Sequence, residues 1–307
     1  MQFMMPSVSL QRIANTSTGK ITSTAAPEPQ LLQLGPDLTV YIGAERDARF
    51  IYKEIYQDNC YDIAPLSSNP CMLHFSMSSQ SRAITNLNRP VIVDAGANIG
   101  LFTLYMKAKY PSAHILAFEP VPQIFDLFRR NLALYNVPTQ DVDVYACALG
   151  SESVTSKPLT YFPNAPGNST FVPEEKDLLR KALPAEHYQR MIDRSSAGAT
   201  QVGVPVERLS RFLDGYPDLA RIDMFKIDVE SWELDVLRGM DDRHWEMVRN
   251  VAVEVSDLSG LRDDIEALLR GKGFWVEREL ASWSYETAPT YTVLARRDGK
   301  GSSSTEP

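Results

Sequence analysis

Residues 91–105, V-I-V-D-A-G-A-N-I-G-L-F-T-L-Y, constrain the fold of this chain more than any other stretch. The apolar run at 91–93 is typical of a buried strand in a parallel sheet. Gly96 and Gly100 follow it, where the backbone must turn sharply and come close to a ligand. Apolar residues then recur with helical spacing from Leu101. This order of strand, glycine turn and helix predicts the nucleotide-binding corner of a doubly wound α/β sheet.

The spacing of the glycines indicates the class of ligand. The pattern is D-x-G-x-x-x-G from Asp94, not the G-x-G-x-x-G that brings a helix N-terminus to a pyrophosphate. S-adenosylmethionine has no phosphate, and it needs backbone room with acceptors for its ammonium group and ribose hydroxyls. Asp94 and Glu119 end two successive predicted strands and supply such acceptors, and an acidic residue about 20 positions on is the expected ribose ligand. A nicotinamide dehydrogenase and an ordinary turn without a ligand are the alternatives.

Three motifs in order resemble the FkbM family of S-adenosylmethionine-dependent methyltransferases. They are V-D-A-G-A-N-I-G-L-F from residue 93, A-F-E-P-V-P from 117 and K-I-D-V-E-S-W-E-L-D-V-L-R-G-M from 226. The resemblance covers about residues 50–297 and is closest to members of polyketide and nonribosomal-peptide pathways, which methylate hydroxyl oxygens. It implies a class I methyltransferase fold, α/β and Rossmann-like, with a doubly wound, mostly parallel sheet, an antiparallel C-terminal strand and an inserted lid.

The resemblance also implies which residues hold S-adenosylmethionine. In class I methyltransferases the residues just after the third strand, predicted here at 142–150, usually meet the adenine edge. The predicted cofactor-binding residues are Asp94, Gly96, Asn98, Gly100, Glu119, Pro120, Ala148, Leu149 and Asp228.

Acidic residues at the ends of predicted strands are the candidates for catalysis. They are Asp94, Glu119, Asp228, Glu230, Glu254 and Asp257. Methyl transfer to oxygen requires a held nucleophile, a base for its proton and a pocket that excludes water. We expect Asp228 to lie beside the reacting centre, with Glu230 on the same face of an extended segment and Asp257 as a further candidate. Like charges held close together raise one pKa, which suits a base near neutral pH.

Other readings of these acids remain open. Glu230 would cap the following helix and Asp228 would bind backbone amides if both are structural. A divalent-metal site from Asp228, Glu254 and Asp257 is a further alternative, although oxygen-only clusters are common on solvated rims, and no metal is assigned.

Ser256 departs from the family pattern, because an imidazole usually stands at this position in an E-V-H-D-like run. Here the run is E-V-S-D. If that imidazole is the base elsewhere, this chain must use Asp228, Asp257, His74 or His187. Loss of activity is the alternative, which would leave a non-catalytic cofactor-binding module in a biosynthetic assembly.

The chain divides into four predicted regions. Residues 1–30 read as a disordered lead, 31–90 as a helical or irregular preamble, 91–298 as the methyltransferase domain and 299–307 as a disordered tail. Residues 151–204 interrupt the alternation of strands and helices. We interpret this insertion as a lid, with a solvated hairpin and surface helix as the alternative.

Composition limits the partners. A net charge of −8 argues against nucleic acid, and no apolar run approaches the roughly 18 residues that span a membrane. Three cysteines are too few for a disulfide framework or a zinc site, so a cytoplasmic location is expected. The expected acceptor is a small molecule, free or carrier-protein-bound, with a sugar hydroxyl as the alternative. The sequence does not predict the oligomeric state.

Overall fold

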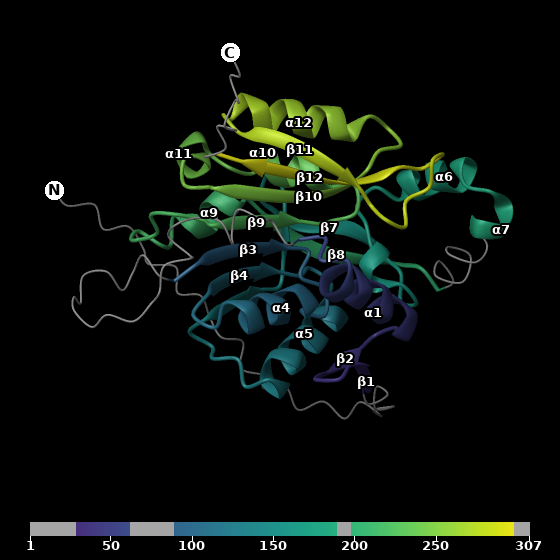
Figure 1. Cartoon of the computed structure of the whole chain (residues 1–307), viewed down its shortest axis with the longest axis horizontal. Coiled ribbons are helices and arrows are strands. Elements are labelled where there is room, and N and C mark those ends of the chain that lie inside the picture. The colour runs from purple at the N-terminus through teal and green to yellow at the C-terminus, as the bar shows by residue number, and fades with distance from the viewer. Residues whose placement is uncertain (1–28, 62–88, 189–197, 298–307) are drawn as a thin grey trace, which may run out of the picture.

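A seven-stranded sheet forms the centre of the computed structural model, which describes residues 29–61, 89–188 and 198–297 (Figure 1). The strand order is β11-β12-β10-β9-β3-β4-β5. Strands β3, β4, β5, β9 and β10 run parallel, and β12 is antiparallel to its neighbours. The predicted sheet with an antiparallel C-terminal strand is therefore confirmed. The strands are β3 (Val91–Ala95), β4 (His114–Phe118), β5 (Val142–Tyr145), β9 (Met224–Ile227), β10 (Asn250–Ser256), β11 (Trp275–Leu280) and β12 (Thr290–Arg296).

Helices cover both faces of this sheet, which explains why its central strands are mostly apolar. Successive residues Ile92 and Val93 belong to two different hydrophobic clusters, because strand side chains alternate between faces. Phe102 and Phe128 belong to the same cluster as Ile92. Leu269 belongs to the cluster that contains Val93. The helices are α4 (Leu101–Lys109), α5 (Pro122–Leu134), α9 (Leu209–Leu213), α10 (Glu233–Arg238), α11 (Asp242–Trp245) and α12 (Leu261–Gly271).

The preamble forms a small unit fixed to α5. Strands β1 (Gln30–Gly35) and β2 (Leu38–Ile42) pair antiparallel and are followed by α1 (Glu45–Tyr52) and the π-helical turn η1 (Lys53–Gln57). The buried side chain of Asn131 on α5 accepts from the Tyr41 amide at 2.7 Å and donates to the Tyr41 carbonyl at 3.0 Å. The sequence did not predict β1, and Gln30, the last residue of the predicted lead, begins it. Helix α1 therefore has a fixed place beside the sheet.

The insertion contributes strands to a second sheet, which has three strands in the order β6-β8-β7. It contains β7 (Val154–Tyr161), η2 (Pro166–Asn168), α6 (Pro173–Ala182) and α7 (Ala185–Tyr188), and β8 (Thr200–Glu207) returns along β7. The prediction of a single strand over 142–150 was wrong, because the chain leaves the central sheet after β5. Its last part forms β6 (Ala148–Leu149), which pairs with β8. A continuous apolar pattern does not reveal such a change of partner.

Several predictions fall outside the described residues. They concern the lead up to residue 28, a short strand at 71–75, His74 and the tail at 299–307. Among the residues that are described, no helix combines the length and apolar character that crossing a bilayer requires.

Candidate active site

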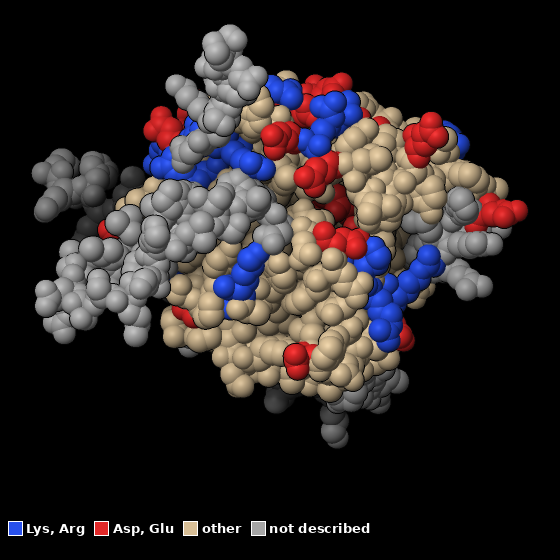
Figure 2. All heavy atoms as spheres, in the orientation of Figure 1, with Lys and Arg blue, Asp and Glu red and all other residues tan. Residues whose placement is uncertain are grey.

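A cavity of about 430 Å³ opens at the carboxyl ends of β3, β4, β9 and β10. This volume is within the range of small-molecule sites. Helix α1, the turn η1 and the insertion complete its wall. Figure 2 shows acidic side chains gathered in this hollow of the surface. The position agrees with the general rule that ligands of open α/β sheets bind beyond the strand ends.

The turn after β3 brings the backbone to the cavity. Gly96 adopts a φ of 80°, and its N–H donates to the Phe118 carbonyl at 3.1 Å. A Cβ atom at Gly96 would lie 1.9 Å from the Asp228 carbonyl oxygen, so only glycine allows this contact between the turn and the end of β9. Gly100 allows the Phe128 ring to pack closely against the backbone, since a Cβ there would lie 2.2 Å from that ring.

Asp94 lies beneath the cavity wall and is not among the residues that line it. Its side chain is fully buried and accepts a hydrogen bond from the Thr103 hydroxyl at 2.8 Å. Its other oxygen is 3.2 Å from the Lys226 ammonium nitrogen. The structure thus gives Asp94 a role in holding Lys226 and α4, and the ammonium contact expected of it stays a prediction.

Glu119 lies in the wall, at the end of β4. Its carboxylate accepts from the Asn98 amide at 3.0 Å and from the Val121 amide at 2.8 Å. Burial raises its pKa to about 7 in spite of these two bonds. Because each carboxylate oxygen has a second lone pair, Glu119 retains acceptors for the two hydroxyls of a ribose.

The structure brings most of the predicted site residues to this one cavity. Those that line it are Gly96, Asn98, Glu119, Pro120, Ala148, Leu149, Asp228 and Glu230. Asp94, Gly100 and Asp257 do not line it. Asp257 is 3.4 Å from the Arg262 guanidinium, so the Asp228, Glu254 and Asp257 trio considered for a metal is not assembled. Nor does any other group of three or more His, Cys, Asp and Glu side chains in the described ranges suit a metal ion.

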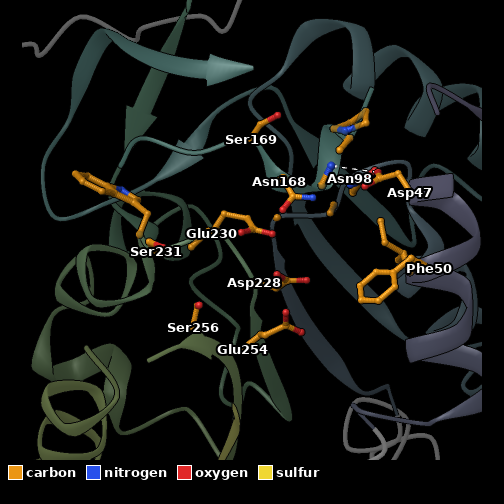
Figure 3. A pocket seen from close by; sticks show the side chains of 18 of the residues that line it. Asp47, Phe50, Asn98, Asn168, Ser169, Asp228, Glu230, Ser231, Glu254 and Ser256 are labelled. Carbon is orange, nitrogen blue, oxygen red and sulfur yellow. Dashed lines mark hydrogen bonds between the residues drawn. The ribbon is translucent and has the colours of Figure 1, made fainter. Parts of the chain in front are cut away.

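Three acidic side chains converge beyond the glycine turn. In Figure 3 Asp228, Glu230 and Glu254 point toward a common space, opposite Asp47 and Phe50 of α1. The Asp228 carboxylate lies 3.5 Å from the Lys226 ammonium nitrogen. Such convergence of acids supplies proton acceptors where a ligand would lie.

Glu230 is held by the insertion. Its backbone has the left-handed φ of 55°, which is rare for a non-glycine residue and is associated with functional sites. Its carboxylate lies 2.5 Å from the Lys176 ammonium nitrogen on α6, and the Thr170 hydroxyl donates to its backbone carbonyl. The insertion and the end of β9 are thereby joined at the cavity.

Burial and mutual repulsion determine the charge of these acids. Burial, then the nearby charge of Asp228, raises the pKa of Glu54 to about 8 and that of Glu254 well above its ordinary value. Burial alone would lower the pKa of Lys226, but Asp94 and Asp228 outweigh it and the pKa is raised. The site therefore combines a fixed cation with carboxyl groups of different proton affinity.

The predicted site residues include none from the preamble. Asp47, Phe50 and Glu54 line the cavity from α1 and η1, and the Trp283 indole donates to Glu54. Their spacing of three and four residues places them on one helical face, a signal that the sequence contains. Lys226, which lies within the third motif, was also missed.

The sheet order and the glycine turn over a nucleoside-sized cavity define a class I S-adenosylmethionine-dependent methyltransferase. Residues 94–276 match the family model of the methyltransferase FkbM domain. The chain belongs to the FkbM methyltransferase family.

Relatives of known name agree with this assignment. The chain is 48% identical to methyltransferase sdnD of Sordaria araneosa, over 83% of this chain and 93% of that protein. It is 40% identical to methyltransferase 1 of Beauveria bassiana, over 87% and 98%. It is 32% identical to the 31-O-demethyl-FK506 methyltransferase FkbM of Streptomyces tacrolimicus, over 76% and 84%. A crystal structure of an FkbM methyltransferase from Methylobacillus flagellatus superposes with a TM-score of 0.42 and 16% identity, over 68% of this chain and 44% of that one.

The cavity fits S-adenosylmethionine, the cofactor of this class. The turn after β3 lines the cavity from Gly96 to Ile99, and Glu119 offers acceptors beside it. Among the described residues, the wall contains seven acidic side chains and three basic ones. Burial raises the pKa of several of these acids, so the charge of the wall depends on pH. The acids are Asp47, Glu54, Glu119, Asp228, Glu230, Glu233 and Glu254, and the bases are Arg46, Lys176 and Lys226.

Glu233→Gln should make the stability of the protein less dependent on pH. Glu233 is buried, and one of its oxygens has no hydrogen-bond partner within the described structure. Burial, then Glu230 and Asp228, raises its pKa from 4.5 to about 8. The folded state therefore keeps a proton that the unfolded state releases, and stability falls as pH rises through this window. Glutamine removes the titration, so the variant should be more stable at the alkaline end, by about 5 kcal/mol.

The measurement is the free energy of unfolding in urea from mildly acidic to mildly alkaline pH. Glu152→Gln, at an exposed position, is the matched control. An equal decline for wild type and Glu233→Gln would show that Glu233 is ionised in the folded state.

Proposed function

We propose that the protein transfers the methyl group of S-adenosylmethionine to a hydroxyl oxygen of a small molecule, a polyketide or peptide secondary metabolite. The observation that carries this proposal is the pair of carboxyl groups, Asp228 and Glu254, facing the cavity beyond the glycine turn. An alcohol holds its proton tightly and needs a base when its oxygen is methylated, whereas a neutral amine has a free lone pair. A carboxylate beside the reacting oxygen therefore favours a hydroxyl acceptor.

Different residues of the cavity wall bind different parts of the cofactor. Glu119 accepts hydrogen bonds from the ribose, and Ala148 and Leu149 line the adenine. Gly96 and Asn98 lie along the amino-acid end. When bound, the cofactor supplies an electrophilic methyl group on a sulfonium.

Asp228 is the base in this proposal. It takes the proton of the acceptor hydroxyl, and Lys226 at 3.5 Å stabilises its charged form. Ser256 lines the same cavity at the position of the family's usual imidazole, and no histidine is among the described lining residues. His74 and the side chain of His187 lie outside the described structure, so the proposal does not use them.

A sugar hydroxyl is the second candidate acceptor. The cavity wall contains the aromatic side chains Phe50, Trp232 and Trp283 as well as the amides of Asn164 and Asn168. Flat aromatic faces pack against the apolar face of a pyranose, and carboxylates and amides bind its vicinal hydroxyls.

The test uses donor cofactor with a ¹³C-labelled methyl group and two panels of acceptors, hydroxylated polyketides or peptides and simple glycosides. We expect a product that is heavier by one methyl group, with the labelled carbon resonating as a methoxy group. A labelled carbon on nitrogen or carbon would contradict the proposal. Turnover of glycosides alone would select the second candidate.

A further inference from the structure

Tyr61, at the end of the described range 29–61, reaches the acid cluster from behind the cavity wall. Its side chain is 3% exposed and does not line the cavity. The ring packs edge-on against Phe102, with centroids 5.5 Å apart. Its hydroxyl oxygen lies 3.1 Å from Oδ2 of Asp228 and 3.3 Å from Oε2 of Glu254. One phenol thus contacts both acids that face the acceptor site.

These contacts fix a minimum number of protons. A phenol has one proton to donate, and an ionised carboxylate can only accept. For the phenol to form a full two-centre hydrogen bond with each acid, one of the two acids must carry a proton and donate it to the phenol oxygen. With both acids ionised, one of the two buried contacts would be a repulsion between oxygen atoms.

The surroundings indicate which acid holds the proton. Asp228 lies 3.5 Å from the Lys226 ammonium nitrogen, whereas Glu254 forms no ion pair with a cation in the described part of the chain. Lys226 also donates to the Gly96 carbonyl at 2.7 Å, so its position is fixed. Of the two acids that contact Tyr61, only Asp228 lies beside this positive charge, so the proton is assigned to Glu254.

We propose that Tyr61 is a positioning residue that accepts a hydrogen bond from protonated Glu254 and donates one to ionised Asp228. The inference rests on the proposed function only in taking Asp228 as the base. In this arrangement the acid pair presents a single oriented carboxylate to the acceptor. As the hydroxyl oxygen gains its methyl group, its proton passes to Asp228, while Tyr61 and Glu254 keep theirs.

The other titratable groups around the cluster are consistent with this assignment. Glu54 and Cys60 face it from the preamble, Asp94 from β3 and Glu230 from beyond β9. Burial and the charges of Asp228 and Glu54 raise the pKa of Glu254. Lys226 is the cation among them, and it pairs with Asp94 and Asp228.

The kinetic test compares Tyr61→Phe, Glu254→Gln and Glu254→Ala. We expect Tyr61→Phe to lower kcat on the order of 10²-fold while leaving the affinity for S-adenosylhomocysteine unchanged. It should also displace the pH profile of kcat, because Asp228 loses a hydrogen bond to its charged form. The amide of Glu254→Gln can donate to Tyr61 as a protonated carboxyl does, so its kcat should exceed that of Glu254→Ala by about tenfold. Equal losses for Gln and Ala would overturn the proposal.

A second readout does not depend on turnover. A protonated carboxyl group has an infrared carbonyl band that is separate from those of carboxylates and amides. We expect this band to be weaker by one carboxyl group in Glu254→Gln than in wild type near neutral pH, in the whole protein with S-adenosylhomocysteine. Identical spectra would show that Glu254 is ionised and would overturn the proposal. If the band differs but the labelled-donor assay shows no hydroxyl methylation, the proposed function is rejected. The assignment of the proton to Glu254 and its hydrogen bond to Tyr61 would still stand.

Discussion

Asp228→Asn is expected to lower kcat about 10³-fold and to leave the affinity for S-adenosylhomocysteine close to that of wild type. Asparagine has nearly the same shape and can still accept from Tyr61, but its amide cannot take a proton from the acceptor. The side chain faces the cavity and lies 3.5 Å from the Lys226 ammonium nitrogen. Single-turnover rates with the labelled donor, beside calorimetric titration of S-adenosylhomocysteine, separate the chemical step from binding.

Asp257→Asn is the matched comparison. The sequence made Asp257 a candidate for the same role, but its carboxylate faces Arg262, outside the cavity. It should keep most of the wild-type rate. A comparable loss in both variants, or full activity of Asp228→Asn, would remove Asp228 from the mechanism.

Lys226→Met should destabilise the protein by about 3–5 kcal/mol, the usual cost of breaking a buried ion pair by removing one partner. Lys226 is 2% exposed and lies 3.2 Å from Asp94, which is fully buried. It also donates to the Gly96 carbonyl at 2.7 Å and so joins β9 to the glycine turn. Methionine fills the space but leaves Asp94 buried without its cation.

The measurement is the free energy of unfolding from urea denaturation. Lys53→Met is the control, because Lys53 pairs with Asp58 at the surface, where solvent screens the attraction. Adding Asp94→Asn to Lys226→Met should recover part of the loss, since it removes the uncompensated charge. If Lys226→Met were no more destabilising than Lys53→Met, the buried network would not contribute as described.

The central sheet was predictable because its strands have a strong local pattern. The apolar runs before Asp94 and Glu119 became β3 and β4, and the glycine turn between β3 and α4 lies where its spacing placed it. Glu119 lies in the cavity wall because the ends of adjacent parallel strands meet at one edge of a sheet. The order of the elements along the chain was enough for these features.

The environment of individual side chains was less predictable, because it depends on residues far apart in sequence. The sequence did not predict that Asp94 also contacts Lys226, 132 positions later, and Thr103. Asp47 and Glu54 reach the cavity only because the preamble is fixed to α5 through Asn131. Tertiary packing, which no local periodicity encodes, decides these contacts.

A crystal structure of the complex with S-adenosylhomocysteine tests the central claim most directly. The account predicts that the ribose hydroxyls contact Glu119, that the adenine lies along Ala148 and Leu149, and that the sulfur atom faces Asp228 and Glu254. A nucleoside bound away from Glu119, or a sulfur atom turned away from Asp228, would contradict it.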